Sequence, residues 1–392
     1  MKSSELEIMV NESIESEKHK AFELNEYIFS NPETPHKEFL AASRYAEILR
    51  NEGIEVEQEF LGVKTAFKAT INEDPDSDIK IGILAEYDAL PEIGHACGHS
   101  ASGALSFLAA LGLYKNRENL KGNIYLIGTP AEEFNGAKTV MANSGMFDDF
   151  SYVVMIHMMD YSQTHAKFMA LAGFDYEFFG QPAHAAAAPW AGKNAVNGMT
   201  LFIHALDMMR QQLRDGSRVH GMIMNGGSSG NTIPDYALCQ YMFRYSEKNY
   251  LDEIVRMAED AAKGAALATQ TTVKITPPAS ALADLKATPH TDDLIGDIYR
   301  ELGVEVDTNP VVSMGSSDIG NLSYRCPAFH PLICISDTPV AAHTREFAQC
   351  MLTDKTKWAI EKGAKTISAL VIRSLYDPSI IENMKTDFNQ NR

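Results

Sequence analysis

The chain has 392 residues, of which 45% are hydrophobic, so it is long enough to form two or three folded domains with substantial cores. Its 52 acidic residues outnumber the 34 basic ones, and the net charge of -18 argues against a surface that binds the phosphate backbone of nucleic acids. No stretch approaches the roughly 20 apolar residues that span a bilayer, and the N-terminal sequence MKSSELEIMVNESIESEKHK lacks the apolar segment of a signal peptide. These features predict a soluble, cytoplasmic protein without nucleic-acid or membrane partners.

The cysteines suggest neither a disulfide framework nor a zinc ribbon. They are odd in number and contain no CxxC pair: Cys97, Cys239, Cys326, Cys334 and Cys350. Most are expected to be buried thiols. Cys97 differs from the others because His95 and His99 flank it at two-residue spacing.

The first part of the chain alternates predicted helices and strands. Apolar residues recur at helical intervals before Asn31 and before Gly53, whereas the run IKIGILA at 79–85 is typical of a central strand covered on both faces. This alternation predicts an α/β domain. The expected elements are a helix at 4–30, a helix at 37–51, strands at 54–60, 65–71 and 79–85, a helix at 101–115, a strand at 122–128, a helix at 137–144 and a strand at 152–157.

The pattern changes near residue 167 and again after Pro277-Pro278. The middle part suits a compact α+β layer, with a strand at 168–180, a helix at 193–213, strands at 218–225 and 236–245, a helix at 249–269 and a strand at 271–276. The last part returns to the first domain, with a helix at 291–302, a glycine-containing turn near Gly315, a strand at 329–335 and a helical region at 345–375. The first domain is therefore expected to comprise residues 1–167 and 283–392, and the inserted domain residues 168–282.

Several acidic and imidazole side chains lie where predicted strands end. They are Asp88, Glu132, Glu133 and His157. Because ligands of open parallel sheets bind at the carboxyl ends of the strands, these side chains are expected to form one site.

The residue types at this site suit a metal ion. Cys97 and His99 lie in a glycine-containing loop before a helix, and a thiolate and an imidazole both bind zinc or a similar transition metal. Adjacent Glu132 and Glu133 point in opposite directions on an extended segment, so one can bind metal while the other faces a substrate water. Taken alone, each pair could instead be a packed core cluster or a solvated acidic pair. The shared position at the strand ends favours a metal site.

Several segments together resemble peptidase family M-20, the aminoacylase and dinuclear metallocarboxypeptidase family. The resemblance covers nearly the whole chain and rests on HACGH at 95–99, GTPAEE at 128–133, His157, His343, GQPAHA at 180–185, NTIPD at 231–235 and MGSSD at 314–318. Within this family the sequence is most similar to the cysteine-ligand amidohydrolase branch. The segment AEYDALP at 85–91 points to its p-aminobenzoyl-glutamate hydrolase and dipeptidase-like subgroup.

The resemblance implies a divalent metal centre with two ions per subunit and Glu132 as the general base. The matched metal ligands are Cys97, His99, Glu133, His157 and His343. Zinc is the first choice because it accepts sulfur ligands well, with manganese, cobalt or nickel as alternatives. The resemblance also implies that the inserted domain is a lid and dimerisation module, giving a homodimer or a higher homo-oligomer.

Three residues of the inserted domain match substrate-binding positions of the family: His220, Asn231 and Arg244. The resemblance implies that His220 reaches the active site of a neighbouring subunit and steadies the scissile carbonyl. The planar fork of Arg244 suits a substrate carboxylate. As alternatives, His220 could simply end a strand and Arg244 could lie on the surface. His184 and His330 each lie in a segment similar to the family's, but either could pack or orient a neighbour.

Two positions depart from the pattern of the family. Glu86 replaces the histidine of a His-x-Asp ligand motif, so Cys97 is expected to supply the missing coordination. Asp88 is then expected to hydrogen-bond a ligand histidine and fix its tautomer rather than bind the metal itself. Together with Glu132 it is a predicted catalytic residue. Ser100 replaces an aspartate of the plant auxin-conjugate hydrolases, which weakens that substrate assignment.

The predicted function is therefore metal-dependent hydrolysis of an amide or peptide bond in a dipeptide, an N-acyl amino acid or an aroyl-glutamate. Two alternatives stay open. Cys97 could be a nucleophile activated by His95 or His99, as in thiol hydrolases. The chain could also be a catalytically silent homologue that binds small peptides or a protein partner.

Overall fold

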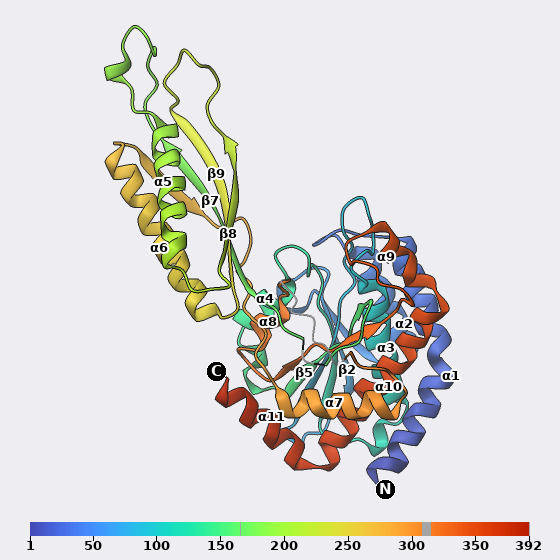
Figure 1. Cartoon of the computed structure of the whole chain (residues 1–392). Coiled ribbons are helices and arrows are strands. Elements are labelled where there is room, and N and C mark those ends of the chain that lie inside the picture. The colour runs from blue at the N-terminus through green and yellow to red at the C-terminus, as the bar shows by residue number, and fades with distance from the viewer. Residues whose placement is uncertain (165, 308–314, 392) are drawn as a thin grey trace. The chain divides into compact units, whose positions relative to one another are not determined.

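The computed structural model describes residues 1–164, 166–307 and 315–391, and it divides the chain into two compact units (Figure 1). Within the described residues, unit 1 comprises 1–167 and most of 285–391, and unit 2 comprises 168–284 together with Gly315 and Ser316. The predicted α/β fold class is confirmed. The roles of the two parts as catalytic domain and lid stay predictions, and Met314 of the MGSSD segment lies outside the described residues.

A six-stranded sheet forms the centre of unit 1. Its order is β1-β2-β4-β3-β5-β11, from β1 (Glu55–Gln58), β2 (Phe67–Asn72), β3 (Lys80–Ala85), β4 (Asn123–Gly128), β5 (Tyr152–Val154) and β11 (Ala328–Phe329). Strand β3 lies between β4 and β5 and runs parallel to both, whereas β1 and β2 add an antiparallel edge. All β3 residues from Ile81 onward are buried, as the continuous apolar run predicts.

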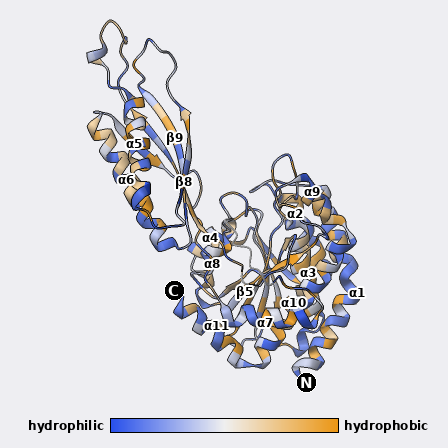
Figure 2. Ribbon diagram, viewed as in Figure 1, coloured by the Kyte–Doolittle hydropathy of each residue, from blue (hydrophilic) through white to orange (hydrophobic). Residues whose placement is uncertain are grey.

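Helices surround this sheet. They are α1 (Ser3–Ser30), α2 (Phe39–Asn51), α3 (His99–Lys115), α4 (Ala137–Asn143), α7 (Pro289–Glu301), α8 (Ile319–Leu322), α9 (Arg345–Gln349), α10 (Asp354–Tyr376) and α11 (Pro378–Gln390). Helix α3 packs against β3 and is covered in turn by α1 and α10, so its residues 99–113 are all buried. Figure 2 shows hydrophobic residues gathered along the strands and on the inner faces of these helices. No helix in the described ranges combines the length and the apolar character needed to cross a membrane.

Unit 2 is an antiparallel sheet with two helices on one face (Figure 1). The strand order is β10-β7-β9-β8. The elements are β7 (Ala170–Phe179), α5 (Ala195–Met209), β8 (Arg218–Asn225), β9 (Tyr236–Tyr245), α6 (Lys248–Ala268) and β10 (Thr272–Thr276). Strand β8 lies at an edge of this sheet, and its residues 220–225 are exposed.

The prediction of a single strand at 152–157 is wrong. Strand β5 ends at Val154, and His157 begins a separate strand, β6 (His157–Met159), which pairs only with β12 (Leu332–Cys334) among the described strands. The reason is that β3 pairs with this segment only as far as Val154. The segment therefore continues its backbone hydrogen bonds on one side only, the side of β11. His157 therefore begins a strand rather than ending one.

The C-terminal part also differs from the prediction. The strand expected at 329–335 is split between β11 and β12, and the helical region at 345–375 is divided by a 3-10 turn at Cys350–Leu352. Helix α11 was not predicted. Pro378 supplies its first residue, and the side chain of Asp377 caps it by accepting a hydrogen bond from the Ser379 N–H at 3.0 Å.

Close packing of α3 on the end of β3 gives the first testable prediction. A Cβ atom added at Gly103 would overlap the carbonyl oxygen of Glu86 and the hydroxyl of Tyr45. Gly103→Ala is therefore expected to lower the free energy of unfolding by about 1–3 kcal/mol, measured by urea denaturation.

Gly296→Ala in α7 is the matched control in the same unit. Its Cβ would meet only Thr164 Oγ1, at 3.9 Å, so the better helix propensity of alanine should raise stability by about 0.5–1 kcal/mol. Equal stabilities of the two variants would contradict the tight contact at Gly103.

Candidate metal centre

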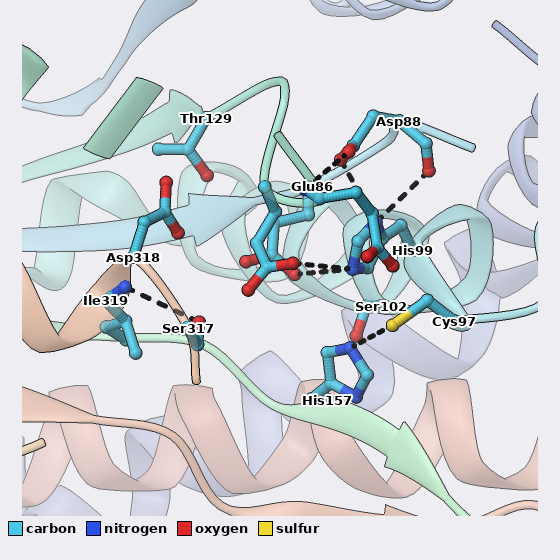
Figure 3. A network of polar contacts seen from close by, with 12 residues as sticks. Glu86, Asp88, Cys97, His99, Ser102, Thr129, His157, Ser317, Asp318 and Ile319 are labelled. Carbon is cyan, nitrogen blue, oxygen red and sulfur yellow. Dashed lines mark hydrogen bonds and ion pairs between the residues drawn. The ribbon is translucent and has the colours of Figure 1, made fainter. Parts of the chain in front are cut away.

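The predicted site residues of unit 1 lie together at the carboxyl ends of the parallel strands. Figure 3 shows Asp88 and His99 facing each other, with Cys97 and His157 beside them. Asp88 follows β3, His157 begins β6, and His99 is the first residue of α3. Open parallel sheets bind ligands at this edge.

Four side chains converge around the sulfur atom of Cys97: His99, Glu133, His157 and His343. Its Sγ lies 3.6 Å from His157 Nε2 and 3.4 Å from His343 Nε2. His343 Nε2 also lies 3.3 Å from Glu133 Oε1. Cys97, His99 and His157 each offer a ligand atom within 4.8 Å of the other two, and so do Cys97, Glu133 and His343. The two groups share Cys97, an arrangement that can hold two cations around one thiolate.

Hydrogen bonds at Nδ1 fix the tautomers of His99 and His157. His99 Nδ1 lies 3.1 Å from the carbonyl oxygen of Asp88 and 3.0 Å from its carboxylate Oδ1, and His157 Nδ1 lies 2.8 Å from the carbonyl oxygen of Met158. Because a carbonyl oxygen only accepts hydrogen bonds, each Nδ1 carries the proton. Each Nε2 is then free to bind a metal ion, and Asp88 orients His99 from behind.

Unusual backbone conformations deliver these side chains. Gly98 has a φ of +100°, and a Cβ atom there would lie 2.8 Å from Met158 Cβ, so only glycine fits between Cys97 and His99. His343 has a φ of +64°, and its N–H donates to the carbonyl of Ala96 at 2.8 Å. A left-handed conformation is unfavourable for a residue with a side chain, and such strain is concentrated at functional sites.

The donor set fits a divalent cation. His99 Nε2 and Glu133 Oε1 are buried, and neither makes a hydrogen bond within the described part of the chain. Such buried polar atoms destabilise the fold by about 1–3 kcal/mol each unless something binds them. A thiolate, imidazoles and carboxylates in one cluster are the ligands of zinc and similar transition metals.

The electrostatics of Cys97 argue against a thiol nucleophile. Burial raises the pKa of its thiol, whereas a nucleophilic cysteine needs a lowered pKa. A bound divalent cation would reverse this shift, because it binds the thiolate form. His95, one of the two proposed activators, instead hydrogen-bonds the carbonyl of Ile28 at 3.0 Å. Cys97 is therefore better suited to binding metal than to attacking a substrate.

Lys138 has no role in the sequence interpretation, and Asp318 enters it only as part of the MGSSD segment. Lys138 Nζ lies 2.6 Å from Glu86 Oε1 and 2.6 Å from Asp318 Oδ1, and all three side chains are fully buried. Although burial opposes the shift, the Lys138 ammonium lowers the pKa of Glu86 to about 2. In the sequence, Lys138 is the one charged residue of the segment AKTVMAN of α4. A lysine on the surface of a helix would look the same, so the sequence does not indicate that Lys138 is buried.

The two ambiguous histidines lie in different surroundings. The ring of His330 stacks on that of His157 with centroids 5.3 Å apart, and burial lowers the pKa of His330 to about 3. It therefore packs against a predicted ligand. His184 Nδ1 accepts hydrogen bonds from the N–H groups of Ala186 and Ala187, both at 3.2 Å, so it stabilises a turn in unit 2.

The three predicted substrate residues belong to unit 2. His220 is exposed on the edge strand β8, and Asn231 is exposed in the loop between β8 and β9. Arg244 lies near the end of β9 and donates a hydrogen bond to Ser316 Oγ at 3.1 Å. The predicted metal ligands all belong to unit 1, so the substrate roles of these residues stay predictions.

A cluster of potential metal ligands at the strand ends of an α/β fold is the arrangement expected of a metallo-hydrolase. Residues 82–373 match the sequence model of peptidase family M20/M25/M40, and the chain belongs to this family. It is a metal-dependent hydrolase of amide or peptide bonds, and the predicted family and enzyme class are confirmed.

Three similar proteins illustrate the range of the family. The Xaa-Arg dipeptidase of Mus musculus is 30% identical over 98% of this chain and 93% of its own length. One component of the p-aminobenzoyl-glutamate hydrolase of Escherichia coli (strain K12) is 29% identical over 68% of this chain and 59% of its own length. The solved structure of a dinuclear metal binding peptidase from the M20 family of Bacillus subtilis has a TM-score of 0.69 and 18% identity, and the match covers 92% of this chain and 99% of that chain.

The position of Asp88 gives a second prediction. Asp88→Asn is expected to weaken the affinity for a divalent metal about 10–100-fold, because a neutral amide no longer holds His99 Nδ1 with a charged hydrogen bond and so no longer raises the basicity of the ligand nitrogen. Competition with a fluorescent chelator measures this affinity. The Asp88 carboxylate accepts a hydrogen bond from the Glu133 N–H at 3.0 Å. Asp74→Asn is the control, since Asp74 likewise accepts one from the Gly122 N–H at 3.0 Å but lies away from the cluster. Unchanged metal affinity in Asp88→Asn would rule out this role.

Proposed function

We propose that the chain cleaves the amide bond of a small substrate whose leaving amine carries a free carboxylate, such as a dipeptide, an N-acyl amino acid or an aroyl-glutamate. One observation carries the proposal. Glu133 joins Cys97 and His343 in a cluster suited to a cation, while Oε2 of the adjacent Glu132 lies 4.0 Å from His99 Nε2. The carboxylates of Glu132 and Glu133 converge near His99 rather than pointing in opposite directions as expected. The proposal assigns Glu133 to the metal and Glu132 to proton transfer.

Each residue then has one task in the reaction. Cys97, His99, Glu133, His157 and His343 would hold the metal. When bound, a divalent cation supplies the Lewis acidity that polarises an amide carbonyl and makes water more acidic. Glu132 accepts the proton of the attacking water and passes it to the leaving nitrogen, so that one carboxylate is both base and acid. Burial lowers the pKa of His157 to about 4, and this imidazole is therefore neutral, as a metal ligand must be, near pH 7.

Relatives and residue types support the choice of substrate and metal. An Xaa-Arg dipeptide and p-aminobenzoyl-glutamate, which the names of two relatives specify, both carry a carboxylate beside the cleaved amide. Arg244 is the proposed partner of that carboxylate, because its planar fork can bind both oxygens. Zinc is the proposed ion because Cys97 offers a sulfur ligand, with manganese, cobalt and nickel as alternatives.

Substitution of the proposed base tests the mechanism. Glu132→Gln is expected to lower kcat about 10²–10⁴-fold, because the amide cannot accept the proton, and to retain the metal content of the wild type. The assay uses dipeptides, N-acetyl amino acids and p-aminobenzoyl-glutamate, with and without a chelator, alongside metal analysis. Glu118→Gln, at an exposed position, is the control. Normal turnover by metal-loaded Glu132→Gln would refute the assignment, and a metal-loaded wild type inactive on the whole panel would refute the proposed substrate class.

We further propose that the chain forms a homodimer through unit 2. Strand β8 pairs only with β9 among the described strands, and consecutive apolar residues of this edge, Met222, Ile223 and Met224, are 59, 54 and 52% exposed. An unpaired apolar edge strand favours pairing with another chain, and a two-fold dimer would cover both edges at once. In such a dimer the exposed His220 on the same strand would serve the active site of the partner.

A complementation experiment tests this arrangement. Glu132→Gln and His220→Ala chains, each inactive alone, are mixed, dissociated and reassociated. If His220 acts on the partner subunit, one of the two sites in each mixed dimer is intact, and roughly a quarter of wild-type activity should return after random pairing. If His220 acts within its own chain, no activity returns and the proposal fails. Sedimentation of the mixture verifies that mixed dimers form.

A further inference from the structure

A second carboxylate cluster lies beside the predicted metal ligands. Glu86, Glu132 and Asp318 each offer a carboxylate oxygen within 4.8 Å of the other two. The side chains of Glu86 and Asp318 are fully buried, and that of Glu132 is 12% exposed. Oxygen ligands at this spacing suit a hard divalent cation such as manganese or magnesium. Three carboxylates with so little solvent repel one another unless a cation balances them.

Lys138 supplies a positive charge inside this cluster. Its Nζ bonds Glu86 Oε1 and Asp318 Oδ1, both at 2.6 Å, and the side chain is fully buried. The ammonium group is a compact point charge with three donors. It therefore bonds two of the three carboxylates that would otherwise be shared by a metal ion.

The backbone holds Lys138 and Asp318 together. The N–H of Lys138 donates to Asp318 Oδ2 at 3.1 Å, so that both carboxylate oxygens of Asp318 bind one residue. A Cβ atom at Gly136 would overlap the carboxylate of Asp318, and only glycine permits this approach of α4 to α8. The lysine is thus fixed at the cluster by main-chain contacts as well as by its charge.

We propose that Lys138 is a built-in cation that occupies the Glu86–Glu132–Asp318 cluster and excludes metal ions from it. Divalent metal ions then bind only in the cluster around Cys97. No metal ion joins Glu132 to the two carboxylates that Lys138 bonds, Glu86 and Asp318. This proposal goes beyond the proposed function, since it concerns which carboxylates bind metal and is tested by counting and locating ions rather than by activity.

The wild-type holoenzyme provides the first test. Crystals equilibrated with excess Mn²⁺ are expected to show anomalous density around Cys97 and none among Glu86, Glu132 and Asp318. An anomalous peak among these three carboxylates, with the Lys138 side chain displaced, would overturn the proposal. This measurement does not depend on the folding of any variant.

Substitution of the lysine provides the second test. Lys138→Ala removes the charge and leaves space, so it should bind one Mn²⁺ per chain more than the wild type, measured by elemental analysis after dialysis. Its thermal unfolding temperature should also rise with Mn²⁺ when the Cys97 cluster is already loaded with zinc. Lys138→Met removes the charge but fills the space, and it should gain no ion.

A distant lysine is the matched control. Lys365 Nζ lies 2.6 Å from Glu361 Oε1 and 3.6 Å from Glu15 Oε2, but the Glu15 side chain is 53% exposed to water. Lys365→Ala should therefore gain no Mn²⁺. A folded Lys138→Ala with the metal content of the wild type would overturn the proposal, and folding of this variant only in the presence of Mn²⁺ would support it. If the variant folds under neither condition, the anomalous map of the wild type decides.

Discussion

The packing of the first turns of α3 on the carboxyl end of β3 is the contact on which the site depends. Gly103 brings the helix against the carbonyl of Glu86, and Ser102 Oγ donates to the carbonyl of Ile156 at 2.7 Å, so the helix is fastened to the segments that follow β3 and β5. This contact places the Cys97–His99 loop opposite Asp88 and beside His157. A helix held farther from the sheet would separate the thiol from the imidazole and carboxylate groups that converge on it.

Charge balance is the second constraint on this region. The cluster around Cys97 has a thiol, imidazoles and the Glu133 carboxylate, which favour a bound divalent cation, and burial raises the pKa of the thiol in the absence of such an ion. The neighbouring carboxylates of Glu86 and Asp318 are already paired with the Lys138 ammonium. The negative charge of one cluster is therefore balanced by a metal ion and that of the other by the Lys138 ammonium. This difference would leave Glu132, which lies between them, available for proton transfer.

The features proposed for substrate recognition and association lie in unit 2. Its antiparallel sheet leaves β8 at an edge, with His220 and the apolar residues that follow it exposed. The same strand would thus both join two chains and present a histidine to the partner. In this proposal dimerisation and catalysis depend on each other, because a chain that loses the edge contact also loses a residue of its active site.

The sequence by itself determined the α/β class, the position of the inserted layer and the residue types of the metal site. These features follow from local periodicity and from short motifs such as HACGH and GTPAEE, in which the chemistry is set by neighbours along the chain. Only the tertiary structure decided that β5 and β6 are separate strands, because that depends on where β3 stops pairing. It also decided the role of Lys138, whose partner Asp318 is 180 residues away along the chain. A lone lysine in a short helix reads as a surface residue, and only the packing of α4 on α8 turns it into a buried cation.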